Sequence, residues 1–161
     1  LNYAFFADEN AVASLALGYK FGGGDEDKFL GSGGDDQFLA LRFSGDHLSD
    51  LPLRWHGQLG YLRAGDSDLL EGIQENNLWF AGLSVDWMLN DRWSLLAQVD
   101  SNAAPSNSGL TAIGDTAATV TGGVRWRFAE EFSVDASIVE DIVVETAADV
   151  IFQISVRYSG R

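Results

Sequence analysis

The C-terminal stretch Phe152-Gln153-Ile154-Ser155-Val156-Arg157-Tyr158, led in by Val150, decides the fold. It alternates apolar and polar residues without a break. Because successive side chains of a β-strand point to opposite faces, the stretch predicts a strand with one apolar and one polar face. Period-two alternation recurs along the chain and predicts an all-β protein. The eight predicted strands are 11–21, 36–44, 51–63, 77–89, 92–101, 116–128, 131–144 and 149–158.

The composition excludes several classes of protein. The 161 residues include 24 Asp or Glu and 10 Lys or Arg, and a net charge of −14 argues against binding to nucleic-acid phosphates. The chain has no cysteine, so disulfides, thiolate metal sites and cysteine nucleophiles are excluded. No apolar run reaches the roughly 18 residues of a transmembrane helix. We expect a single domain, residues 1–161, without cofactor, metal or nucleic-acid partner.

The links between the predicted strands alternate in length. Those at 90–91 and 129–130 are near-minimal turns, whereas those at 22–35, 64–76 and 102–115 are long, polar and acidic. Short turns at one end and long loops at the other are typical of outer-membrane β-barrels, and the amphipathic final strand resembles their C-terminal signal. We therefore expect an antiparallel up-and-down transmembrane β-barrel of eight strands in a Gram-negative outer membrane. An even strand count would place both chain ends on the periplasmic side.

Aromatic residues favour the same architecture. Amphipathic rings collect at membrane–water interfaces, so two belts are expected near the strand ends. Trp79 falls near the long loops, and the other aromatics of the set fall near the short turns. The predicted interface aromatics are Trp79, Trp87, Trp93, Trp126, Phe128, Phe132 and Tyr158.

Charged side chains lie within the strands on the polar face. Alternation alone does not say which face is inside, so a soluble barrel with an apolar interior, such as a lipocalin-like carrier, is the alternative. A membrane barrel must hide these charges inside, where they are expected to pair. The predicted interior charge network is Arg42, Arg54, Asp86, Asp100, Arg125, Arg127, Asp135 and Arg157.

The acidic loops are a second candidate site. Oxygen-rich loops can bind calcium, but the glycine and acid run at 22–27 lacks the ligand spacing of an EF-hand. A solvated rim, or divalent-cation bridging to lipopolysaccharide, explains the acids as well. The acidic loop residues are Asp25, Glu26, Asp27, Asp35, Asp36, Asp66, Asp68, Glu71 and Glu75.

Enzyme signatures are weak in this sequence. His56 lies mid-strand on the polar face, beside Arg54 and Gln58, and nothing at readable spacing pairs it with a serine. We expect an interior histidine with satisfied hydrogen bonds and assign no catalytic residue. A lipid-acting hydrolase centred on His56 remains the enzymatic alternative.

A resemblance to a known family rests on residues 139–150, on 60–66 together with 76–80, and on 30–34. These stretches resemble an uncharacterised proteobacterial family that looks like outer-membrane β-barrels and is known only as a domain of unknown function. Members of that family are longer, so the resemblance implies that this chain corresponds to their C-terminal half. It would be either a shortened relative that closes at eight strands or part of a larger barrel. The family carries no agreed activity or catalytic residues.

Three functions follow as hypotheses. The leading one is an outer-membrane barrel with a structural, adhesive or assembly role and a salt-bridged interior. The second is a porin-like pore or transport component for small solutes or anions, and the third is a lipid-modifying barrel enzyme. Expected partners are outer-membrane lipid and lipopolysaccharide, the barrel-assembly machinery through the C-terminal strand, and other subunits if the barrel is incomplete.

Overall fold

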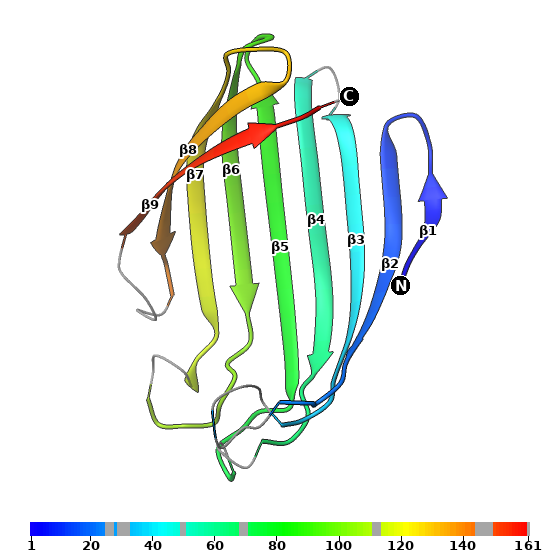
Figure 1. Cartoon of the computed structure of the whole chain (residues 1–161), viewed down its shortest axis with the longest axis vertical. Coiled ribbons are helices and arrows are strands. Elements are labelled where there is room, and N and C mark those ends of the chain that lie inside the picture. Colours follow the sequence, from blue (N-terminus) through cyan, green and yellow to red (C-terminus); the bar gives the residue numbers. More distant parts are fainter. Residues whose placement is uncertain are drawn as a thin grey trace.

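Nine antiparallel strands form one sheet and follow one another in chain order (Figure 1). They are β1 (Asn2–Ala7), β2 (Ala11–Lys20), β3 (Asp36–Leu48), β4 (Leu51–Arg63), β5 (Asn77–Met88), β6 (Trp93–Asn102), β7 (Ala117–Arg127), β8 (Phe132–Asp141) and β9 (Val150–Tyr158). This computed structural model describes residues 1–24, 28, 33–48, 51–67, 71–110, 114–143 and 150–160. The predicted features at 25–27, 30–32, 68 and 144–149 lie outside these ranges.

The prediction of an all-β, antiparallel, up-and-down chain is confirmed, and the eight predicted segments correspond to β2 through β9. The count of eight is wrong, because Asn2–Ala7 forms the additional strand β1. The register between β1 and β2 shifts between Ala4 and Phe6, as at a β-bulge. A bulge inserts an extra residue, so Phe5 and Phe6 stand side by side and interrupt the alternation on which the prediction depended.

The sheet does not close into a barrel. Within the described residues no pairing joins β1 to β9. These two edge strands run in the same direction, because each of the successive pairings between them is antiparallel and the strand count is odd. They therefore cannot form the antiparallel pair that would close an up-and-down barrel. The even count that would return both chain ends to one side is wrong for the same reason, and the N and C marks lie at different heights (Figure 1).

The two faces of the sheet differ in polarity and in curvature. Small polar-face residues are buried although the sheet is a single layer, and Ala40 and Ser94 are 0% and 8% exposed. On the other face Leu83 and Trp126 are 48% and 45% exposed. A pocket of about 640 Å³ is lined mainly by polar-face residues of β4 through β9, so the polar face is the concave one. This arrangement is the reverse of a lipocalin-like carrier, which holds its apolar face inside.

A conventional hydrophobic core is missing from the described part of the chain. Its buried hydrophobic residues are Ala16 and Ala40, and no large side chain there is fully buried. The accessible surface is 11022 Å². A compact soluble protein of the same mass, 17.4 kDa, exposes only about 7,900 Å². The excess is what a one-layer curved sheet without a covering layer produces.

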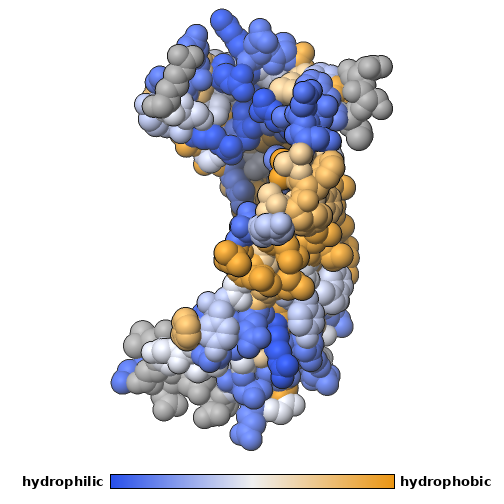
Figure 2. Space-filling view, turned by 90° about the vertical axis from the view of Figure 1, so that its right-hand side faces the viewer, coloured by the Kyte–Doolittle hydropathy of each residue, from blue (hydrophilic) through white to orange (hydrophobic). Residues whose placement is uncertain are grey.

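The two ends of the sheet also differ. Short turns at 8–10, 89–92 and 128–131 lie at one end, and the longer links at 21–35, 64–76 and 103–116 lie at the other. Seen from the β1 edge, a band of hydrophobic side chains crosses the middle of the molecule between two hydrophilic ends (Figure 2). No helix in the described ranges has the length and hydropathy needed to span a membrane.

Candidate functional site: the concave polar face

The ionisable side chains of the strands gather on the concave face. Cross-strand register places the predicted network residues there, since Arg54 lies opposite Asp86, and Arg125 lies opposite Asp135. Arg42 is linked to Asp100 through successive partners on the two intervening strands. All eight predicted residues therefore share this face, but the structure connects only some of them.

Arg125 is the centre of the connected group. Its Nε and Nη2 atoms donate to Oδ1 and Oδ2 of Asp135, at 2.7 and 2.8 Å, which is a bidentate pair. Its Nη1 atom donates to Oδ2 of Asp86 at 2.6 Å. Arg157 adds a longer contact of 3.4 Å from Nη2 to Asp135. The side chains of Arg125, Asp86 and Asp135 are only 17%, 13% and 13% exposed, so these charges compensate one another largely away from water.

The reach of Arg125 across two strands has a local cause. Ser94 of β6 lies opposite Arg125 in the register, and its small side chain is buried. Arg125 can therefore extend over β6 to Asp86 on β5. The remaining oxygen of Asp86, Oδ1, is buried without a hydrogen-bond partner among the described residues. Ser94 was not singled out from the sequence, because a serine on the polar face carries no signal of this role.

The other four predicted charges lie outside this cluster. Arg54 contacts Asp46 at 3.4 Å, with both side chains well exposed. Arg127 donates to the backbone carbonyl of Asp91 at 3.3 Å. Asp100 accepts a hydrogen bond from Gln98 at 2.6 Å. Arg42 has no hydrogen bond or ion pair within the described ranges. The predicted single network is thus one cluster of four residues and four separate charges.

Five of the seven predicted interface aromatics form a ladder at the short-turn end of the convex face. Ring contacts run from Trp93 to Trp126, Phe128, Phe132 and Tyr158 in turn, with centroid separations of 5.0–5.9 Å. All of these rings are exposed on the convex side. The ladder joins β6, β7, β8 and β9, so five of the six aromatic residues predicted for the short-turn end lie together.

Trp79 and Trp87 stand apart from this ladder at opposite ends of β5. Trp79 lies toward the long links, where its register partner Tyr61 donates a hydrogen bond to Asn77. Trp87 lies toward the short turns, opposite Leu95. Both rings are exposed on the convex face, so aromatics occur near both ends of this strand.

Aromatic rings that cover glycines were not foreseen from the sequence. Phe38 lies opposite Gly18, and its ring occupies the space where a Cβ on that glycine would sit. Phe80 covers Gly60 in the same way. Both rings are on the concave face, toward the long links. Phe38 on an otherwise polar face is therefore explained, because an aromatic ring compensates for the missing side chain of the facing glycine.

The long links are joined by contacts of acidic residues to the backbone. Asp35 accepts hydrogen bonds from the Gly22 N–H at 2.6 Å and from the Tyr19 hydroxyl. These two donors hold the pKa of Asp35 below its ordinary value. Asp36 accepts from Lys20 at 2.5 Å and from the Gly65 N–H at 3.0 Å. At least part of the predicted acidic rim therefore organises the links.

Glycines allow two of these links to pack backbone against backbone. A Cβ on Gly65 would meet the N and O atoms of Asp35 at 2.5 and 2.6 Å, and a Cβ on Gly34 would meet the backbone of Gly65 at 2.6 Å. These distances are too short for any side chain. The contact between the links at 21–35 and 64–76 therefore requires glycine at both positions.

Replacing Gly65 by Ala is expected to lower the free energy of unfolding by about 1–3 kcal/mol, because the added methyl group must push two backbones apart. Gly23→Ala is the matched control, since nothing lies within 4 Å of a Cβ at that position. Urea unfolding in detergent, followed by tryptophan fluorescence, measures both changes. Equal stability of the Gly65→Ala variant and the unaltered chain would contradict the close contact.

The geometry gives little support to the two other candidate sites, a hydrolase centre at His56 and a metal site. His56 has Ser44 and Ser84 as its register partners, but no hydrogen bond joins it to either. A nucleophile and its base need such contact, so the hydrolase alternative finds no catalytic pair in the described part of the chain. Within the same residues no group of three His, Asp or Glu side chains is placed to hold a metal ion.

A comparison with known protein families identifies the family of this chain. Residues 1–159 match the family described as a protein of unknown function, DUF3187. The chain belongs to the DUF3187 family. The predicted membership of an uncharacterised family is confirmed at that level. No curated protein matches the chain.

Three of the stretches on which the resemblance rested, 30–34, 60–66 and 76–80, meet in the folded DUF3187 chain. Gly34, from the stretch 30–34, and Gly65, from the stretch 60–66, pack against each other in the link contact. Asn76, from the stretch 76–80, donates to the Ala64 carbonyl at 3.0 Å and to Asp66 at 2.8 Å. These glycine and amide positions thus serve the organisation of the long links.

Proposed function

We propose that this DUF3187 chain forms the lipid-facing wall of a β-barrel in a Gram-negative outer membrane, with a structural, adhesive or assembly role. The observation that carries the proposal is the continuous apolar convex face. Trp87, Leu95, Val124, Ala136 and Ile154 are successive register partners and make an unbroken apolar row across β5 through β9. Monomeric soluble proteins rarely expose contiguous apolar patches larger than a few hundred Å².

Strand length and the position of the aromatics support the same proposal. Strands β2 through β9 have 9 to 13 residues. A tilted strand needs about 9–11 residues to cross the hydrocarbon region. The aromatic ladder then lies at one membrane interface, and the hydrophilic ends in Figure 2 extend into water on both sides.

Orientation follows from the two kinds of link. In bacterial outer-membrane barrels the short turns are periplasmic and the long loops are extracellular. We therefore place the end of β9 on the periplasmic side, where the barrel-assembly machinery would meet the C-terminal strand. The acidic long links would face lipopolysaccharide. In line with the family resemblance, we propose that the chain corresponds to the C-terminal half of longer proteobacterial relatives. Further strands or subunits would then complete the barrel wall.

Flotation with lipid vesicles tests the membrane proposal. The chain, refolded from urea into vesicles of outer-membrane phospholipid, is expected to float with them in a sucrose gradient and to stay bound after an alkaline carbonate wash. The control is the same refolding without lipid or detergent, which should give aggregate. A soluble, monodisperse, folded chain in plain buffer would rule out the proposal.

A pore or transport role is the second candidate, favoured by the open sheet. Eight strands make a barrel just wide enough for side chains to fill it. Nine strands from this chain do not close, so a closed wall that contains them would be wider and would leave a channel along the concave face. Conductance across a planar bilayer separates the two roles, because a filled barrel passes no current.

A further inference from the structure

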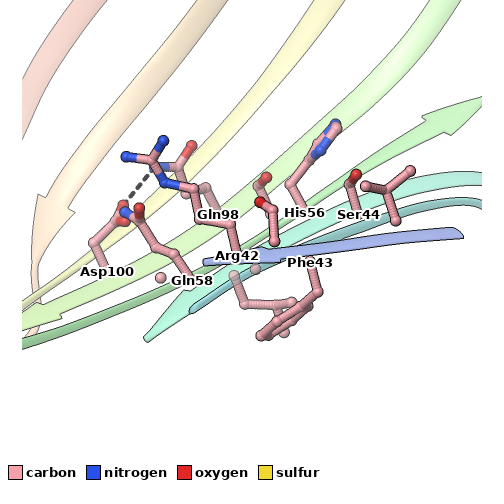
Figure 3. A pocket seen from close by; sticks show the side chains of 13 residues that line it. Arg42, Phe43, Ser44, His56, Gln58, Gln98 and Asp100 are labelled. Atoms are coloured by element: carbon pink, nitrogen blue, oxygen red, sulfur yellow. Dashed lines mark hydrogen bonds between the residues drawn. The ribbon is translucent and has the colours of Figure 1, made fainter. Parts of the chain in front are cut away.

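The middle of the concave face holds a pocket of about 330 Å³. Its polar lining residues project from one side of the sheet, whereas the ring of Phe43 projects from the other (Figure 3). They belong to the consecutive strands β2 through β6, so the pocket is formed within this chain whether or not a barrel closes around it. The side chains that could donate hydrogen bonds to a ligand are Ser14, Arg42, Ser44, His56, Gln58 and Ser84.

Arg42 is distinguished from the other concave-face arginines by its lack of a partner. Arg125 and Arg157 contact carboxylates, Arg54 contacts Asp46, and Arg127 donates to a carbonyl. No hydrogen bond or ion pair of Arg42 is found in the described ranges. A guanidinium that lines a pocket with all its donors free is suited to bind an anion from outside the chain.

Further hydrogen-bond donors surround Arg42. Ser14 and Gln58 are its register partners on the two neighbouring strands. His56 is two residues from Gln58 on β4 and therefore lies diagonally across from Arg42, within reach of a small shared ligand. The hydroxyls of Ser44 and Ser84 flank His56. Hydroxyl, amide and imidazole N–H groups all donate to oxygen.

One acid, Asp100, lines the same pocket. It lies on β6, three strands from Arg42, and Gln98 donates to its carboxylate at 2.6 Å. This hydrogen bond satisfies one carboxylate oxygen and leaves its negative charge in place. Asp100 therefore weakens the binding of any anion beside Arg42, and this opposing effect can be tested.

We propose that the pocket binds a small oxyanion, with a carboxylate or phosphate group held by the Arg42 guanidinium and by hydrogen bonds from His56 and the adjacent serines. The volume of about 330 Å³ accommodates a small oxyanion. The planar fork of Arg42 matches two oxygens of either group. The inference goes beyond the proposed membrane role, which would stand if the pocket bound nothing.

Calorimetric titration of the refolded chain in detergent micelles tests the site, with inorganic phosphate and malonate as separate probes. Saturable binding of at least one probe is expected. Arg42→Gln should weaken it by about tenfold or more, because charge-assisted hydrogen bonds are lost. Arg42→Lys, which keeps the charge without the fork, should be intermediate. Asp100→Asn should tighten binding, because it removes the opposing charge.

Arg127→Gln is the matched control, since it removes an arginine from the same face but outside this pocket. Its affinity should equal that of the unaltered chain. Circular dichroism establishes that each variant is folded. The proposal is overturned if the unaltered chain binds neither probe, if Arg127→Gln loses as much affinity as Arg42→Gln, or if Asp100→Asn weakens binding. If Arg42→Gln does not fold, Arg42→Lys and Asp100→Asn decide the question.

Discussion

Replacing Arg125 by Leu is expected to lower the free energy of unfolding by about 3–5 kcal/mol, the cost of leaving a largely buried charge without its partner. The substitution removes the cation that Asp86 and Asp135 share, and both carboxylates are only 13% exposed. Asp86 on β5 and Asp135 on β8 would then lose the cation between them, and the two anions would repel each other across β6 and β7. Urea titration in detergent, followed by the fluorescence of the five tryptophans, gives the free energy of unfolding.

Two companion variants sharpen this measurement. Asp135→Ala should also destabilise, because it removes the bidentate partner of Arg125 and leaves Arg125 with Asp86 alone. Arg127→Leu is the control, since that side chain makes only a 3.3 Å contact with a carbonyl, and its change should stay within about 0.5 kcal/mol. An Arg125→Leu variant as stable as the control would show that the four-residue cluster does not hold the wall together.

Placing an arginine on the convex face at Leu83 is expected to cost about 2–4 kcal/mol of stability in lipid bilayers, the range measured for a basic residue at the bilayer midplane. Leu83 is 48% exposed and projects from the middle of β5. In a water-soluble protein the same substitution would place a charge on an exposed surface at little cost. The prediction therefore separates a lipid-facing from a water-facing convex side.

Ser84→Arg provides the matched control one residue along the strand. Its side chain enters the concave face beside polar partners, where an added arginine should change stability much less. Unfolding in phospholipid vesicles, compared for both variants, gives the two values. If Leu83→Arg cost no more than Ser84→Arg, the convex face would not contact acyl chains.

Much of the fold could be predicted because the side-chain period of a strand is local information. Alternation in the sequence predicts β2 through β9 and places Arg125, Asp135 and Asp86 on one face. It missed β1, where the bulge at Phe5 breaks the period. The prediction of a closed barrel was also wrong, because the additional strand β1 makes the two edge strands run in the same direction. Whether the total number of strands is even or odd cannot be read from any local sequence pattern.

The candidate site was less accessible from sequence because it depends on register. Alternation indicates that Arg125 and Asp86 share a face. Only the pairing of β5, β6 and β7 shows that Arg125 lies opposite Ser94 on β6 and diagonally across that strand from Asp86 on β5. Likewise, only the three-dimensional arrangement shows that Arg42 has no hydrogen-bond or ion-pair partner among the described residues. The packing of Gly34 on Gly65 joins two links that are distant in the chain. The sequence shows a glycine in each link but does not show which backbone segment packs against it.

The common direction of β1 and β9 constrains any complete cylinder that contains this sheet. A closed barrel in which every neighbouring pair of strands is antiparallel has an even number of strands. The nine strands of this sheet therefore need an odd number of further strands to complete such a barrel. Two copies related by rotation about the cylinder axis would supply eighteen strands, yet each junction between copies would pair parallel edges. A strand inserted between β9 and β1 that runs opposite to both would satisfy the backbone groups of both edges at once.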